Sequence, residues 1–156
     1  MKTSQQKTRG IALWAARISL ALVFIINLQC CFDFIVFPEQ FIGAYELVGV
    51  PGIVALQGLA VAFLMWNATY PIAIFNPIKY KIVFIIVLIQ QAIGLIGESF
   101  IFLNIDNAHA LLQASVLRFI IFDGAGLILM LISFICLAKH SSTTPSENTK
   151  GARKLL

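Results

Sequence analysis

The chain has 156 residues, of which 60% are hydrophobic and 12% are charged, and its mean hydropathy is +0.92. This balance is too apolar for a water-soluble domain and is typical of a membrane protein whose helices face lipid on at least one side. The formal net charge of +4 is small, and no basic face alternates with aromatic residues, so we expect no nucleic-acid partner.

The first apolar segment, residues 11–37, follows a polar and basic stretch at residues 1–10 that we expect to form a cytoplasmic arm. The segment exceeds the length of about 20 residues that a helix needs to cross a bilayer. A secretory signal peptide has a shorter apolar core and a small-residue cleavage site, which this segment does not supply. We therefore predict a retained transmembrane helix over residues 11–37.

A break and a second helix come next. Residues 38–51 contain two prolines and two glycines, which predict a loop, and its apolar side chains suggest that it lies on the membrane surface. The apolar run over residues 52–70 predicts the second transmembrane helix. Because Trp and Tyr favour the bilayer interface, Trp66 and Tyr70 indicate where this helix leaves the membrane.

Two further apolar segments complete the membrane domain. Residues 82–103 predict the third helix, and residues 111–138 predict the fourth, after a short loop. The tail at residues 141–156 is polar, and we expect it to be disordered. The sequence therefore predicts an all-α polytopic membrane protein, with four transmembrane helices in a compact bundle that forms one domain over residues 11–140.

The basic residues predict the orientation of these helices. Of the eleven Lys and Arg residues, all but Arg17 and Arg118 lie outside the helices. They fall before the first helix, between the second and third, and after the fourth: Lys2, Lys7, Arg9, Lys79, Lys81, Lys139, Lys150, Arg153 and Lys154. The other two loops contain neither Lys nor Arg. By the positive-inside rule, both termini are predicted to be cytoplasmic.

Polar residues within the apolar segments form a candidate intramembrane cluster: Asn27, Asp33, Gln91, Glu98, Arg118 and Asp123. A charge at the centre of a membrane helix costs roughly 2.5 kcal/mol or more, so such side chains face protein or water. Gln91, Gly94 and Glu98 share one helical face by their spacing. Arg118 and Asp123 are five residues apart, about 140° around the axis, and therefore point in different directions.

Two interpretations of this cluster remain open. In the first, Arg118 pairs with Glu98 or Asp33 and the amides bond between helices, so that the cluster fixes the bundle. In the second, a carboxylate left without a counter-ion titrates, binds a cation or polar ligand, or relays protons. The excess of acidic over basic groups keeps the second interpretation open.

No catalytic or metal-binding motif is present. Cys30 and Cys31 lie in the first helix, and Cys136 lies near the opposite end of the fourth, too far away for a disulfide. His109 and His140 lie on opposite sides of the predicted membrane, and no Cys/His pattern suggests zinc. We therefore assign no catalytic residue and no metal ligand, and the sequence does not identify a cofactor.

Four short helices, an arginine early in the first (Arg17), and Gly-Val-Pro-Gly at residues 49–52 leading into Leu-Gln-Gly-Leu-Ala at 56–60 resemble the DoxX-like membrane family. The resemblance covers roughly residues 17–138. Because members of that family are small bacterial membrane proteins, the resemblance implies the same for this chain. Some members are linked to thiosulfate or quinone oxidoreduction, and many have no known activity. No catalytic residue carries over from it.

Three functions are compatible with these patterns. The first is an accessory or scaffold subunit with a structural polar cluster. The second is an oligomeric transporter or a membrane protein that binds protons or a small ligand, and the third is a quinone-linked redox subunit of the DoxX-like type. The expected location is a cell membrane, bacterial or, in a eukaryote, the endoplasmic reticulum. The expected partners are the lipid bilayer and either further copies of the chain or another membrane subunit.

Overall fold

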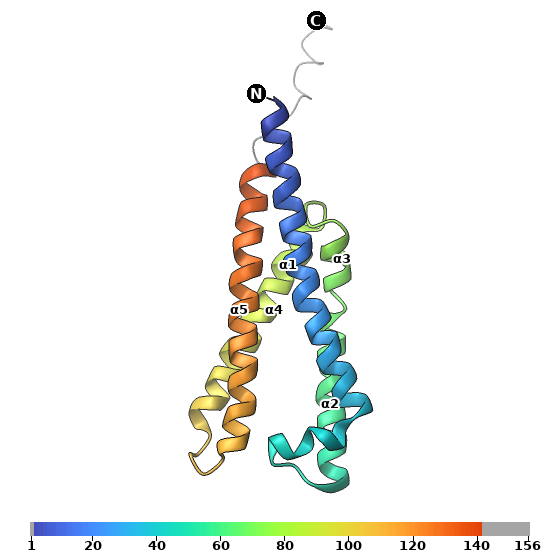
Figure 1. The fold of residues 1–156 in the computed structure, drawn as a ribbon, viewed down its shortest axis with the longest axis vertical. Coiled ribbons are helices and arrows are strands. Elements are labelled where there is room, and N and C mark those ends of the chain that lie inside the picture. Colours follow the sequence, from blue (N-terminus) through green and yellow to red (C-terminus); the bar gives the residue numbers. More distant parts are fainter. Residues whose placement is uncertain (1, 142–156) are drawn as a thin grey trace, which may run out of the picture.

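The computed structural model describes residues 2–141, with the side chains of residues 6–140. This part of the chain is helical and contains no strand (Figure 1). The elements, in order, are α1 (Lys2–Val36), the 3-10 helices η1 (Pro38–Gln40) and η2 (Ile42–Tyr45), α2 (Gly49–Asn67), α3 (Tyr70–Phe75), α4 (Lys81–Asn104) and α5 (Ala110–Ser141). The predicted disordered tail falls almost wholly outside the described residues.

Four helical segments of the described chain are long and apolar enough to cross a membrane: Gln6–Val36, Gly49–Phe75, Lys81–Asn104 and Ala110–His140. This confirms the all-α class and the number of candidate spans. The start of α1 and the end of α5 lie at one end of the molecule, and η1, η2 and the α4–α5 loop lie at the other (Figure 1).

The first helix begins earlier than its apolar segment does. It starts at Lys2, so that most of the stretch at 1–10, expected as an arm, continues the helix. Residues 2–9 include Lys, Gln and Arg, which are good helix formers, and no proline interrupts them. Gly10 is the weakest helix former in this stretch, and it does not break the helix.

The second crossing is broken close to its predicted end. α2 ends at Asn67, and α3 begins at Tyr70 with Pro71 in its first turn, where a missing N–H is tolerated. Tyr70 is fully buried and stacks on Phe24, with ring centroids 5.8 Å apart. Tyr70, expected at the bilayer interface, is thus a core residue of the bundle, because α3 turns this side chain toward α1 and α4.

The tightly packed core lies in the half of the bundle nearest the described chain ends. α1, α3, α4 and α5 meet there around side chains that are fully or almost fully buried: Leu20, Val23, Tyr70, Phe84, Val87 and Met130. Arg17 fastens α3 to α1 by donating from Nη2 to the carbonyl oxygen of Phe75, at 2.7 Å. This half matches the predicted compact bundle.

The other half of the bundle is open. α2 packs along α1, where Phe34, Leu56 and Ala60 form a second small cluster. Phe119 of α5 also packs on this cluster, and its ring centroid lies 6.0 Å from that of Phe63 in α2, but the backbone of α2 does not run close to those of α4 and α5. In the lower half of Figure 1, α1 and α2 accordingly lie apart from α4 and α5. The predicted compactness thus holds only for one half, and the space between the two helix pairs holds the candidate sites.

Candidate functional site: two cavities between the helices

The first cavity, of about 360 Å³, lies between α2, α4 and α5. Its polar lining comes from Asn27, Asn67, Gln90, Gln91, Glu98 and Asp123, and its apolar lining includes Leu59, Phe63, Ile93, Ile101, Val116 and Phe119. Neither Lys nor Arg lines it. We call it the acidic cavity, because two carboxyl groups face a space without a basic side chain.

A chain of hydrogen bonds positions Asp123 in the acidic cavity. The Tyr70 hydroxyl donates to Oε1 of Gln91 at 2.9 Å, and Nε2 of Gln91 donates to Oδ1 of Asp123 at 2.8 Å. Gln91 is only 3% exposed. Buried polar groups that are fully paired hold a single geometry. These two hydrogen bonds therefore fix α3, α4 and α5 relative to one another and orient the Asp123 carboxyl group.

Glu98 lies on the same face of α4 as Gln91 and Gly94, as its spacing predicts, and it faces the acidic cavity. Its Oε2 atom is buried and has no hydrogen-bond partner among the described residues. A buried polar atom without a partner carries a desolvation penalty of about 1–3 kcal/mol, and more when it is charged. Glu98 is therefore a group in this cavity with a buried oxygen atom that no described residue bonds.

Other polar side chains within the described helices are paired with one another. Asn27 donates to Asn67 at 3.2 Å, and Thr69 donates to Gln90 at 2.9 Å. These bonds join α1 to α2 and the α2–α3 junction to α4. They match the structural interpretation of the amides, in which interhelical hydrogen bonds fix the bundle.

A second cavity, of about 540 Å³, lies between α1, the η1–η2 segment and α5. Its charged residues are Asp33 and Arg118, and we call it the mixed-charge cavity. Arg118 donates from Nη2 to Oγ of Ser115 at 3.0 Å, and no ion pair joins it to Asp33 or Glu98 in the described part of the chain. The ion pair of the first interpretation is therefore not formed in this structure.

The six predicted cluster residues thus divide between two sites. The acidic cavity contains Gln91, Glu98 and Asp123, the mixed-charge cavity contains Asp33 and Arg118, and Asn27 lines both. Helix geometry explains the division, because Arg118 and Asp123 project about 140° apart from α5. The Arg118 side chain is therefore turned away from the two carboxyl groups of the acidic cavity.

Tyr45, at the end of η2, also lines both cavities. Burial raises the pKa of its phenol, nearby Cys30 and Glu98 raise it further, and Arg118 lowers it. Tyr45 therefore keeps its hydroxyl proton at neutral pH and can act as a hydrogen-bond donor. Sequence reasoning missed this residue, because a tyrosine in an apolar loop gives no sign that the loop folds back onto the helices.

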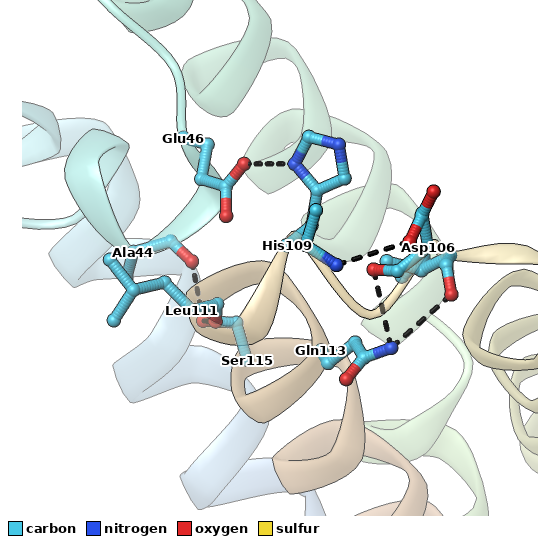
Figure 2. Close-up of polar contacts among 9 residues, drawn as sticks. Ala44, Glu46, Asp106, His109, Leu111, Gln113 and Ser115 are labelled. Carbon is cyan, nitrogen blue, oxygen red and sulfur yellow. Dashed lines mark hydrogen bonds and ion pairs between the residues drawn. The ribbon is translucent and has the colours of Figure 1, made fainter.

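Contacts between η2 and the start of α5 hold this loop in place (Figure 2). The His109 ring forms an ion pair with the Glu46 carboxylate, Nδ1 to Oε2, at 2.5 Å. Ser115 donates to the Ala44 carbonyl oxygen at 2.6 Å. We call these contacts the loop latch, and the sequence analysis, which placed His109 and His140 on opposite sides of the membrane and gave His109 no partner, did not anticipate it.

Comparison with known proteins adds no assignment. The sequence matches no family model and no curated protein, and no solved structure matches the chain. Within residues 2–141, no group of three or more His, Cys, Asp or Glu side chains is arranged to hold a metal ion. A functional proposal therefore depends on the geometry and charge of the two cavities.

Proposed function

We propose that this chain is a multi-pass protein of a cell membrane that binds a lipophilic cation in the acidic cavity. The observation that carries the proposal is the buried Oε2 atom of Glu98, which has no partner among the described residues. A cationic or hydrogen-bond-donating head group would supply the bond that the protein does not. The rest of the cavity fits the same class of ligand.

Charge favours a cation over an anion or a neutral polar molecule. Glu98 and Asp123 both line the cavity, and no basic side chain lies there to balance them. Two carboxyl groups in a space of low dielectric attract a positive charge more strongly than they would in water. A bound cation also offsets the desolvation of the carboxyl groups, as a counter-ion does for intramembrane charges.

The remaining walls favour an apolar or aromatic ligand body. Phe63, Trp66 and Phe119 line the cavity together with several aliphatic side chains. Aromatic faces attract organic cations, by about 2 kcal/mol or more when the pair is shielded from water. A volume of about 360 Å³ lies within the range of about 300–1,000 Å³ that is typical of small-molecule sites.

The route of entry follows from the open half of the bundle. α2 supplies one wall of the cavity and α4 the facing wall, but these helices do not pack along each other. A ligand dissolved in the bilayer can therefore enter between them without crossing the packed core. We propose lateral entry from lipid, which suits a ligand with an apolar body.

A direct test uses benzyltrimethylammonium and its uncharged isostere neopentylbenzene, with the protein reconstituted in lipid nanodiscs. Trp66 lines the cavity, so a Trp14→Phe background, which leaves Trp66 as the one tryptophan, reports binding by fluorescence. We expect the cation to bind more tightly than its isostere. Glu98→Gln should weaken cation binding by about tenfold or more, because it removes a carboxyl charge from a space of low dielectric, where opposite charges attract strongly.

The matched control is Glu39→Gln, which makes the same chemical change at an exposed carboxylate on η1. This variant should bind benzyltrimethylammonium like the parent protein. Equal affinity for the cation and the isostere would contradict the proposal. So would unchanged cation binding in Glu98→Gln.

A scaffold role is the second candidate, and the paired amides favour it. The Tyr70–Gln91–Asp123 chain and the Asn27–Asn67 bond are closed within the protein and need no ligand. In that case the partners would be further copies of the chain or another membrane subunit. Failure of the cation-binding test, together with a detergent-solubilised mass larger than one chain, would favour this role.

A further inference from the structure

The mixed-charge cavity holds two opposite charges that do not neutralise each other. Asp33 and Arg118 both line it, yet no nitrogen of Arg118 lies within 4.0 Å of a carboxylate oxygen among the described residues. Exposed ion pairs form readily at that distance. The two groups are therefore held on separate walls, on α1 and α5, with about 540 Å³ of space in this cavity.

Both charged groups also keep most of their bonding capacity. A guanidinium carries five N–H donors, and Arg118 uses one of its nitrogens to donate to Ser115 in the described structure. No described residue donates a hydrogen bond to the Asp33 carboxylate. A ligand that places an oxyanion at Arg118 and a cation at Asp33 would pair both charged groups at once.

The polarity of the cavity changes with depth along the helices. Asp33 lies three residues from the end of α1, about 5 Å by helical rise, and Arg118 lies eight residues into α5, about 12 Å. Ile26 and Phe122, which also line the cavity, lie farther from the loops along the same helices. The two charged groups therefore lie in the part of the cavity nearer the loops, as the head groups of a lipid leaflet lie nearer the water, and the deeper part is lined by Ile26, Phe122 and one amide, Asn27.

From this arrangement we infer that the mixed-charge cavity binds a zwitterion of the phosphoethanolamine class, with its phosphate at Arg118 and its ammonium at Asp33. A guanidinium fork matches phosphate oxygens in a bidentate geometry, and an ammonium donates strong charge-assisted bonds to a carboxylate. The Tyr45 hydroxyl lines the same space and can donate a further bond to the phosphate. This site does not depend on the function proposed for the acidic cavity.

Native mass spectrometry of the delipidated protein in detergent tests the inference. The probes are dioleoylphosphatidylethanolamine, dioleoylphosphatidylglycerol, which has the phosphate without the ammonium, and glycerophosphoethanolamine, which has the head group without acyl chains. We expect the first lipid to bind about tenfold more tightly than the second, since one charge-assisted bond separates them. Asp33→Asn should remove that preference, whereas Arg118→Gln should weaken the binding of both lipids.

The controls separate binding from folding. Glu39→Gln, an exposed carboxylate on η1, should keep the preference of the parent protein. Helical content and elution volume in gel filtration check each variant. If Arg118→Gln does not fold, Arg118→Lys is tested instead. Lysine keeps the charge but lacks the guanidinium fork, so Arg118→Lys should weaken the binding of both lipids, to a smaller extent than expected for Arg118→Gln.

Two results would overturn the inference: equal binding of the two lipids by the parent protein, or an unchanged preference in Asp33→Asn. The third probe identifies the source of the zwitterion. Binding of the phosphatidylethanolamine alone supports a lipid ligand, and equally tight binding of glycerophosphoethanolamine supports a free zwitterion at the same site. Benzyltrimethylammonium binding should be unaffected by Asp33→Asn, so each cavity can fail its test independently.

Discussion

At the scale of single residues, Gly94 determines where the Asp123 carboxyl group can lie. A Cβ atom at Gly94 would be 2.5 Å from Oδ2 of Asp123, closer than real Cβ contacts allow. The same carboxyl group accepts a hydrogen bond from Gln91 through Oδ1. Because Gln91 holds Oδ1, the Asp123 carboxyl group can move away from a side chain at residue 94 only by giving up this hydrogen bond, and glycine at residue 94 leaves room for Oδ2.

We therefore predict that Gly94→Ala destabilises the protein by about 1–3 kcal/mol, the usual effect of overpacking an interior contact. Gly97→Ala is the matched control, because a Cβ there meets nothing within 4 Å and the residue lies on the same helix. Alanine has a higher helix propensity than glycine by about 1 kcal/mol, so Gly97→Ala should be neutral or stabilising. Thermal unfolding in one detergent measures both.

Removing the Asp123 side chain should relieve this clash. In the double mutant Gly94→Ala/Asp123→Ala, the alanine at residue 94 should add less destabilisation than it does in the parent protein. Equal melting temperatures for Gly94→Ala and Gly97→Ala would show that the close approach does not matter for stability.

At the scale of elements, the loop latch joins η2 to the α4–α5 loop at the open end of the bundle (Figure 2). Glu46 has a left-handed backbone conformation, with φ of 55°, which few non-glycine residues adopt. η2 also carries Tyr45, which lines both cavities. The latch therefore holds one wall of each cavity, and its strength depends on the charge of His109.

We predict that the latch weakens as the pH rises. The hydrogen bond and the charge of Glu46 raise the pKa of His109 above its ordinary value of 6.5, with a smaller contribution from Asp106. Because the pKa of His109 is higher in the folded than in the unfolded protein, the latch contributes its full stabilisation below about pH 6.5. This stabilisation disappears as the pH rises through the pKa of His109 in the folded protein. Glu46→Gln should therefore lower the melting temperature in mildly acidic buffer and have progressively less effect in alkaline buffer.

Glu39→Gln serves as the comparison for the latch as well, because Glu39 is exposed and belongs to the neighbouring element η1. Its effect on the melting temperature should not change over the range in which His109 titrates. A Glu46→Gln effect that stays constant across that range would mean that the latch does not depend on protonated His109.

At the scale of the whole molecule, the bundle is closed at one end and open at the other. The closed half is joined by α1, α3, α4 and α5. In the open half, the α1–α2 pair contacts α5 mainly through Phe119, and the helix backbones run apart. The distribution of Lys and Arg predicts that the open half faces away from the cytoplasm. Both cavities would then lie in the outer half of the bilayer.

Cysteine labelling of intact cells tests this orientation. In a background without Cys30, Cys31 and Cys136, a membrane-impermeant thiol reagent should label Asn107→Cys, because Asn107 lies in the exposed α4–α5 loop. Lys79→Cys, in the exposed α3–α4 turn, should react only after the membrane is opened. External labelling at Lys79 would reverse the orientation and place both cavities in the inner half.

Properties that accumulate locally along the chain could be predicted from the sequence. The four candidate spans, the helical class and the positions of the intramembrane polar residues follow from hydropathy summed over about 20 neighbouring residues. Directions within one helix also follow, because each residue turns by about 100°. The shared face of Gln91, Gly94 and Glu98 and the divergence of Arg118 from Asp123 are of this kind.

The tertiary structure alone decided how one helix is turned toward the next. Tyr70 is a core residue because α3 packs against α1 and α4. Arg118 lacks a carboxylate partner in the described structure because α5 turns it toward the space beside α1. The His109–Glu46 contact joins residues 63 positions apart. Such pairings depend on the packing of whole helices, in which many weak contacts between distant segments are summed. They therefore cannot be predicted from neighbouring residues in the sequence.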